Sequence, residues 1–187
     1  MKKRAFLFLV ILIFQSIFGY AADERQLRSY SGNYDLRGDK KAGVSLAYGG
    51  AAGAPQLGLE LNFVPEHSAV TGVGFGPSHK SFQMGWKYSG PGDVVNPYTL
   101  MGWSRGFNST GSGNPNESYV LQAQMEPEEA ATGQFSFDMA VLGAGLQLNQ
   151  LHGELSGVTF FAEAMVLVRI PSGKVLPAAG IGATFLF

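Results

Sequence analysis

Residues 158–170, with the sequence VTFFAEAMVLVRI, alternate between two kinds of side chain over their whole length. The even-numbered positions from Val158 to Ile170 are all apolar, and the opposite positions include Glu163 and Arg169. Strict alternation predicts a β-strand with one apolar and one more polar face. The stretch 174–187, KVLPAAGIGATFLF, continues the pattern, because alternate residues from Val175 to Phe187 share one face.

The same period runs through most of the chain and predicts strands in ten segments. One face of nearly every segment is large and aliphatic or aromatic, and the other is mostly Gly, Ser, Ala, Asn or Gln rather than the Lys and Glu of a soluble sandwich. This arrangement suits an apolar face toward lipid and a polar face toward a lumen. The ten segments are 27–37, 41–50, 56–64, 69–77, 80–89, 97–107, 117–126, 134–149, 157–170 and 174–187.

We therefore predict an all-β fold, a single antiparallel up-and-down transmembrane β-barrel. Only a closed barrel lets strands cross a bilayer without unsatisfied backbone groups. The composition agrees, since 45% of the residues are hydrophobic and only 14% are charged, against roughly 25% charged in an average soluble domain. The 26 glycines disfavour a helical bundle. A soluble periplasmic sandwich is the alternative fold.

The N-terminus has the order of features found in a secretory signal peptide. Lys2, Lys3 and Arg4 precede an apolar run that is shorter than the roughly 20 residues of a membrane-spanning helix. Small residues lead to a predicted cleavage after Ala21, with Ala22 as the alternative. The domain organisation is thus a signal peptide, 1–21, and a barrel domain, 22–187. No later run is apolar enough for a transmembrane helix.

The mature chain has 10 basic and 14 acidic residues, a mildly acidic balance without a basic footprint for nucleic acid. The chain contains no cysteine, which excludes disulfides, thiol catalysis, cysteine–zinc sites and a lipoprotein anchor. We expect no cofactor and no metal site.

The last residues, Gly182-Ala183-Thr184-Phe185-Leu186-Phe187, resemble the C-terminal insertion signal of bacterial outer-membrane β-barrel proteins. Gly182, Phe185 and Phe187 fill its glycine, hydrophobic and terminal aromatic places. The resemblance implies a location in the cell outer membrane of a Gram-negative-type bacterium. It also implies recognition by the barrel-assembly machinery during insertion. Outer-membrane lipid would then be the other partner, with the barrel a monomer.

A barrel of this class has both termini in the periplasm, so its strand number is even. Ten strands satisfy that rule. Eight is the alternative, reached if the first segment is periplasmic and two neighbouring segments merge. The ten-strand count places the loops near 38–40, 65–68, 90–96, 127–133 and 171–173 outside, and the polar stretch 108–116 on the inner side, where turns are usually short.

Three local features bear on the lumen. After Val141 the apolar face changes phase to Leu142, which predicts a β-bulge there. Pro177 removes a backbone donor from the last strand. Gly72, Gly74 and Gly76 would leave a strip of wall bare, which favours either a narrow water path or tight curvature.

Seven charged residues are predicted to line the lumen. Opposite charges in a narrow barrel normally pair into a structural network, because an unpaired buried charge is costly. The functional alternative is a lining that selects ions or small solutes. The seven are Asp35, Arg37, Glu60, Lys87, Asp138, Glu163 and Arg169.

One local pattern resembles a catalytic site. His79-Lys80-Ser81 is similar to the His-x-Ser pair of outer-membrane lipid A deacylases, and Asp93 would be the acid that orients the histidine. The match departs from that family in its aspartate and in its mid-chain position. None of the three histidines has metal-ligand spacing. We predict no catalytic residues and no enzyme activity.

The function predicted from the sequence is that of a non-catalytic small outer-membrane barrel with a structural or envelope-integrity role. A narrow passive channel for ions or small solutes is the alternative. A lipid A-modifying hydrolase is the more distant one.

Overall fold

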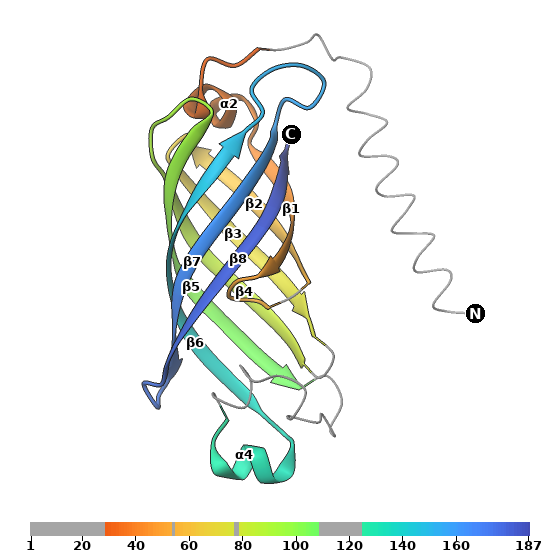
Figure 1. Cartoon of the computed structure of the whole chain (residues 1–187), viewed down its shortest axis with the longest axis vertical. Coiled ribbons are helices and arrows are strands. Elements are labelled where there is room, and N and C mark those ends of the chain that lie inside the picture. Colours follow the sequence, from red (N-terminus) through yellow and green to blue (C-terminus); the bar gives the residue numbers. More distant parts are fainter. Residues whose placement is uncertain (1–28, 54, 77–78, 109–124) are drawn as a thin grey trace, which may run out of the picture.

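The computed structural model describes residues 29–53, 55–76, 79–108 and 125–187, and forms a closed barrel of eight antiparallel strands in sequence order (Figure 1). The prediction of an up-and-down barrel is confirmed. The strands are β1 (Ala42–Gly49), β2 (Gln56–Val64), β3 (His67–Phe75), β4 (His79–Ser89), β5 (Val95–Asn108), β6 (Ser136–Asn149), β7 (Val158–Ile170) and β8 (Val175–Leu186).

The ten-strand count is wrong, and the eight-strand alternative holds. The segment expected as the first strand contains α2 (Asn33–Asp39) instead. No strand lies between β5 and β6, which pair directly from Val95↔Leu148 to Phe107↔Ser136. The other expected segment, 117–126, lies outside the described residues up to 124. The eight strands of the closed barrel correspond to the other eight predicted segments, and no two of these have merged.

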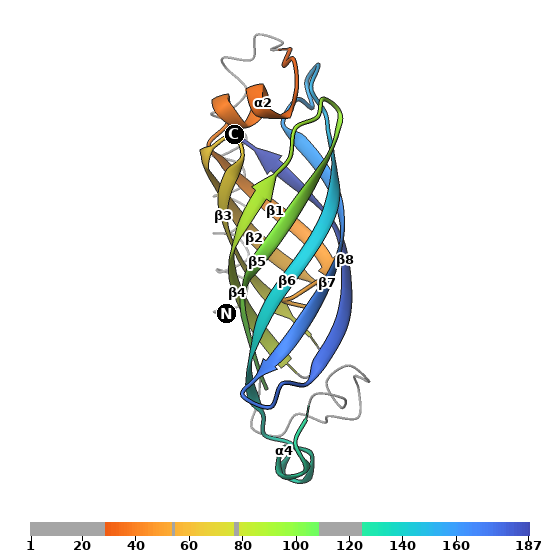
Figure 2. The same cartoon turned by 90° about the vertical axis from the view of Figure 1, so that its left-hand side faces the viewer.

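Because the expected first strand is absent, each strand in the first half of the chain runs in the direction opposite to that of the ten-strand prediction. Two short connections, 65–66 and 90–94, now share one end of the barrel with α2 and the C-terminus. The long β5–β6 connection, which carries α4 (Pro127–Thr132), lies at the opposite end (Figures 1 and 2). Asn108, at the end of β5, therefore lies at the opposite end of the barrel from the C-terminus. We call the two ends of the barrel the α2 end and the α4 end.

The outer surface of the barrel is apolar, as the alternation predicted. Large hydrophobic side chains point away from the lumen on every strand. Examples are Leu59 at 53% exposed, Met101 at 60% and Ile181 at 64%. Their outward exposure would be costly in water and favourable against lipid.

The β-bulge predicted at Val141–Leu142 does not exist. The pairing of β6 with both neighbours runs without a shift through these residues. Odd-numbered positions face inward along all of β6, with Met139, Val141 and Gln147 buried. The sequence changes phase because the lumen itself changes from apolar to polar along the strand. A register shift does occur between β2 and β3, at Asn62/Val64.

The β1–β2 connection folds into the barrel. Gly49, Gly50 and Gly53 have φ values of 86°, 77° and 87°, which residues other than glycine rarely adopt. The turn they build buries Ala51 and Ala52 to 4% and 1% exposed. Figure 1 shows that β1 and β2 end well before the α4 ends of β5 to β8.

In the described part of the chain, no helix is long and apolar enough to cross a bilayer.

Candidate functional site

The lumen consists of a polar half near the α2 end and an apolar half near the α4 end. At the centre of the polar half, the Glu60 carboxylate pairs with two cations. Arg37 Nη2 lies 2.8 Å from Glu60 Oε1, and Lys87 Nζ lies 3.2 Å from Glu60 Oε2. Ser68 Oγ donates a further hydrogen bond to Glu60 Oε1 at 2.9 Å. The three charged residues are nearly inaccessible to solvent, so their charges are stabilised by one another and not by water.

Arg37 belongs to α2 and not to a strand. This helix covers the α2 end of the barrel (Figure 2), and its Arg37 side chain is 1% exposed. The Nε of Arg37 donates to the Pro65 carbonyl oxygen at 2.8 Å. The helix therefore closes the lumen and places the positive charge of Arg37 inside it, where Glu60 is the counter-charge.

A network of amide side chains completes this closure. Asn149 Nδ2 donates to Asn33 Oδ1 at 3.2 Å and to Asn96 Oδ1 at 2.7 Å. Gln147 Nε2 donates to Asn33 Oδ1 at 3.0 Å. All four amide residues are 2% exposed or less. Side-chain hydrogen bonds thus join strands β5 and β6 to α2 across the α2 end of the lumen.

A second polar pair lies deeper in the polar half. Tyr98 donates from its hydroxyl to Glu163 Oε2 at 2.8 Å, and Lys87 Nζ lies 4.6 Å from the centre of the Tyr98 ring. A cavity of about 50 Å³ lies between Glu60, Lys87 and Glu163. That volume suffices for a few water molecules, since one water needs roughly 10–15 Å³.

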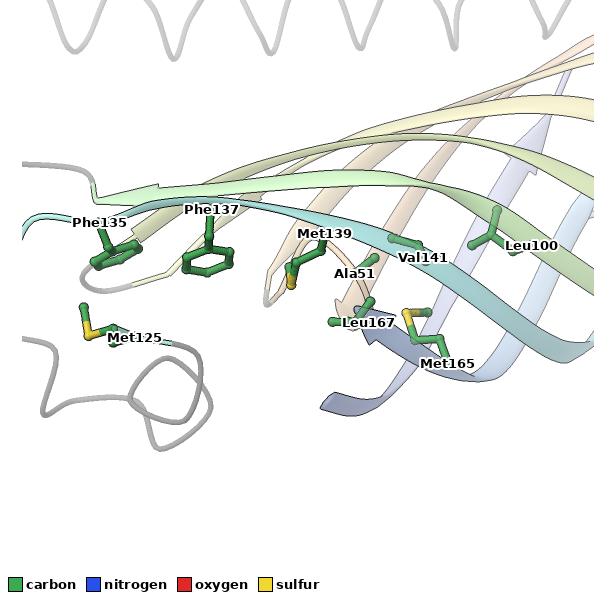
Figure 3. Packing of buried hydrophobic residues seen from close by; sticks show 9 residues of the cluster. All are labelled: Ala51, Leu100, Met125, Phe135, Phe137, Met139, Val141, Met165 and Leu167. Atoms are coloured by element: carbon green, nitrogen blue, oxygen red, sulfur yellow. The ribbon is translucent and has the colours of Figure 1, made fainter. Parts of the chain in front are cut away.

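The apolar half is a hydrophobic core inside the barrel, shown in Figure 3. The cluster members come from β5, β6, β7 and the β1–β2 connection, and residue 125 joins from the start of the α4 segment. Each is at most 8% exposed. The members are Ala51, Leu100, Met125, Phe135, Phe137, Met139, Val141, Met165 and Leu167.

The β1–β2 connection is held in this half by hydroxyl groups from the wall. Ser104 Oγ donates to the Ala51 carbonyl oxygen at 2.7 Å, and Ser81 Oγ donates to the Ala52 carbonyl oxygen. The Ala52 carbonyl occupies the position that a side chain at Gly74 would need. Gly72 likewise lies beneath the side-chain amides of Gln56 and Gln83. The glycine strip is therefore covered, and the space above it is not a water path.

Two ion pairs hold helix α4 over the apolar half at the α4 end of the barrel. Arg169 Nη2 donates to both Glu129 carboxylate oxygens at 2.9 Å, and Lys174 Nζ lies 3.1 Å from Glu126 Oε1. Glu126 and Glu129 also form a capping box at the start of the helix. These acidic residues therefore hold the segment against β7 and the β7–β8 turn.

Five of the seven charged residues proposed for the lumen lie within it. Glu60, Lys87 and Glu163 point inward from strands, Arg37 enters from α2, and Arg169 lies at the α4 mouth. The structure brings Arg37, Glu60 and Lys87 into one cluster. The alternation on β2, β4 and β7 was the signal that located the strand residues.

Two of the seven lie elsewhere. Asp35 is exposed on α2 and accepts hydrogen bonds from the backbone nitrogen and hydroxyl of Ser31. Asp138 points outward and lies 3.7 Å from Arg105, another outward residue. The prediction of Asp138 in the lumen followed from the same assumption as the absent bulge, that the apolar face of a strand always faces lipid. That assumption also missed the buried apolar cluster as a site.

The three residues of the C-terminal motif lie on β8 and at the chain end. A side chain at Gly182 would collide with the Phe161 ring, 2.5 Å away, and with Ala47 Cβ, 2.8 Å away. The rings of Phe185 and Phe187 stack with centroids 6.4 Å apart. Glycine at 182 thus permits close packing of β8 on β1 and β7, and recognition by the assembly machinery stays a prediction.

The residues of the hydrolase-like pattern do not assemble. His79 and Ser81 lie at the α4 end of β4, whereas Asp93 follows Ser89 at the other end. Ten residues of strand separate His79 from Ser89, or roughly 33 Å at about 3.3 Å per residue. The Ser81 hydroxyl is bonded to the Ala52 carbonyl rather than to a base. Among the described residues, no group of His, Asp and Glu side chains is arranged to hold a metal ion.

A closed antiparallel barrel with an apolar exterior and a largely buried polar network inside is a small outer-membrane β-barrel. Because lipid is the only environment that matches this exterior, the chain is an outer-membrane protein of the cell envelope. No family model matches the chain, and no curated protein matches it in sequence.

Solved structures with similar folds are themselves barrels of this class. The N-terminal β-barrel domain of Pseudomonas aeruginosa OprF is 16% identical, with a TM-score of 0.48, over 78% of this chain and 98% of that domain. The Yersinia pestis outer membrane protein Ail in a phospholipid nanodisc is 14% identical, with a TM-score of 0.42, over 80% of this chain and 100% of that one. The crystal structure of Ail gives 16% identity and a TM-score of 0.42, over 79% and 95% of the two chains.

Proposed function

We propose that this protein is a non-catalytic structural barrel that supports the integrity of the outer membrane and does not conduct ions. The observation that carries the proposal is the filling of the lumen at three levels. The amide network and Arg37 close the α2 end, the Glu60 cluster fills the middle, and the β1–β2 connection fills the apolar half.

The cavities found in each half of the lumen, among the described residues, do not favour a channel. One lies in the polar half, with about 50 Å³, and the other in the apolar half, with about 70 Å³. The two share no lining residue. An ion crossing the barrel would have to leave its hydration shell inside the apolar half, where no charged group lines the cavity.

The orientation that we propose places the α4 end outside the cell. Periplasmic turns are usually short in this class, and outer loops are longer. The connections at the α2 end are residues 65–66, 90–94 and 150–157, whereas the connection from β5 to β6 at the α4 end runs from 109 to 135.

The test is planar-bilayer conductance of the refolded mature chain. A boiled-versus-unboiled gel shift would first establish that the barrel has folded. We expect no single-channel steps from the wild type. Reproducible steps would contradict a closed lumen and would favour the passive channel.

A triple variant provides the control, with Arg37→Ser, Glu60→Ser and Lys87→Ser removing the charged cluster together. The apolar half still blocks this variant, so we expect it to remain silent as well. Steps in the triple variant alone would show that the Glu60 cluster is a gate of a channel, and would overturn the structural assignment. Cells that lack the protein should in addition admit a large hydrophobic dye faster than cells complemented with either form.

A further inference from the structure

The apolar half of the lumen contains a cavity that the structural role does not use. It measures about 70 Å³, and its walls are the β1–β2 connection and inward residues of β4 to β8. Phe137, Met139, Leu167 and Leu176 supply the apolar lining, and Ala51 forms part of the floor. Neither Lys, Arg, Asp nor Glu lines it.

The barrel wall beside this cavity is incomplete. β1 pairs with β8 only as far as Gly49↔Gly180, with a last bond from the Gly50 nitrogen to the Ala179 carbonyl oxygen. β8 continues to Val175 and there pairs only with β7. Among the described residues, the edge of β8 from Val175 to Ala178 is therefore left without a pairing strand on its β1 side, next to the cavity residue Leu176.

Pro177 suits this free edge. Backbone groups alternate in direction along an antiparallel strand, so Pro177 points the same way as Ala179, past the end of β1. A residue without an N–H leaves no donor unsatisfied at that position. The edge is thus adapted to remain unpaired, which resolves the difficulty that the proline presented in the sequence.

The route along the barrel axis is closed at the α4 end. Met125 and Phe135 belong to the buried cluster, and Lys174 Nζ holds the Met125 carbonyl oxygen at 2.9 Å. Arg169 fixes α4 through its two bonds to Glu129. A ligand for the cavity would accordingly enter from the side, where the exterior of the barrel meets lipid.

The chemistry of the cavity specifies its ligand. A cavity of about 70 Å³ is less than half of the roughly 150 Å³ that admits benzene, so a ring is excluded and the end of a slim alkyl chain is favoured. Met139 is an adaptable side chain that can move aside for such a chain.

We propose that the apolar half of the lumen binds the end of the unbranched alkyl chain of a fatty acid, which enters from the membrane past the unpaired edge of β8. This goes beyond a structural role, because it gives the barrel a specific small-molecule ligand. The binding is non-covalent and requires no catalytic group.

Photolabelling of the full mature chain in phosphatidylcholine vesicles tests the proposal. The probe is palmitic acid with a diazirine near the end of its chain. We expect labelling of the peptides that contain Met139 and Leu167, and competition by excess unlabelled palmitic acid. Ala51→Phe fills the cavity and should lower this labelling about tenfold. The matched control is Ala140→Phe, which adds the same ring on the outward face of β6 and should leave the labelling unchanged.

Leu176→Trp provides a second variant, since Leu176 lies at the open edge and is only partly buried. It should also lower the labelling, and it replaces Ala51→Phe if that variant fails the gel-shift test for folding. Labels confined to outward residues such as Leu142 and Ile181 would overturn the proposal. So would labelling that excess palmitic acid does not reduce, or equal labelling of the cavity by a diazirine phosphatidylcholine, which would indicate fluctuating lipid tails rather than a fatty-acid site.

Discussion

The two halves of the lumen share strands β4 to β7 but are held together differently. In the polar half, Glu60 is surrounded by two cations and a hydroxyl, and its stability depends on a few directional contacts. In the apolar half, Phe137, Met139 and Leu167 pack as in the core of a soluble protein. A barrel interior is therefore not uniformly polar, and the sequence of an inward face can change character within one strand.

The largest effect is expected from breaking the polar half at its centre. Glu60→Leu removes the carboxylate that pairs with the buried Arg37 and Lys87, and should lower the free energy of unfolding by about 3–5 kcal/mol. Urea unfolding of the barrel in vesicles measures this loss. The triple variant Arg37→Met, Glu60→Leu and Lys87→Met should recover most of it, because an apolar replacement of a whole ionic cluster is often neutral. No recovery would mean that the cluster contributes more than charge balance.

A smaller loss is expected from a cavity in the apolar half. Leu167→Ala removes buried methyl groups from the cluster and should cost about 3 kcal/mol in the same unfolding measurement. The neighbouring Val166→Ala acts on the lipid-facing side, where Val166 is 42% exposed, and should cost less. Equal losses from the two substitutions would argue against a packed core inside the barrel.

The fastening of α4 should contribute about 1 kcal/mol. Arg169→Met removes both bonds to Glu129, and we expect faster hydrogen exchange in residues 127–132 with little change elsewhere. Arg105→Met is the control, because Arg105 lies 3.7 Å from Asp138 and the two side chains are 50% and 37% exposed. If both variants exchange alike, the ion pair does not hold the helix.

The last comparison concerns the phase of β6 rather than stability, and it comes from single labels. The chain has no cysteine, so Met139→Cys and Ala140→Cys each give one attachment point for a fluorophore. Brominated lipids should quench the label at 140 and not the label at 139, since odd positions of β6 face inward. Quenching at 139 would restore the predicted bulge and with it an apolar face that points to lipid before Val141.

Much of the fold could be predicted from the sequence because alternation is a local property. The apolar positions of β2, β4 and β7 face outward as their period indicated, and Glu60, Lys87 and Glu163 face the lumen. The first expected strand failed because a short stretch with the right period, around Tyr34 and Leu36, forms α2 when its neighbours give it a barrel end to cover.

The sequence by itself determined a membrane barrel with an apolar exterior, since period and composition depend only on residues near each other in the chain. The tertiary structure alone decided the number of strands, which fixes the end at which each connection lies. It alone decided that Arg37 reaches Glu60 from a helix and that the β1–β2 connection fills the lumen beside Ser104. Those contacts join residues far apart in sequence, and their existence depends on register and closure, which no local pattern contains.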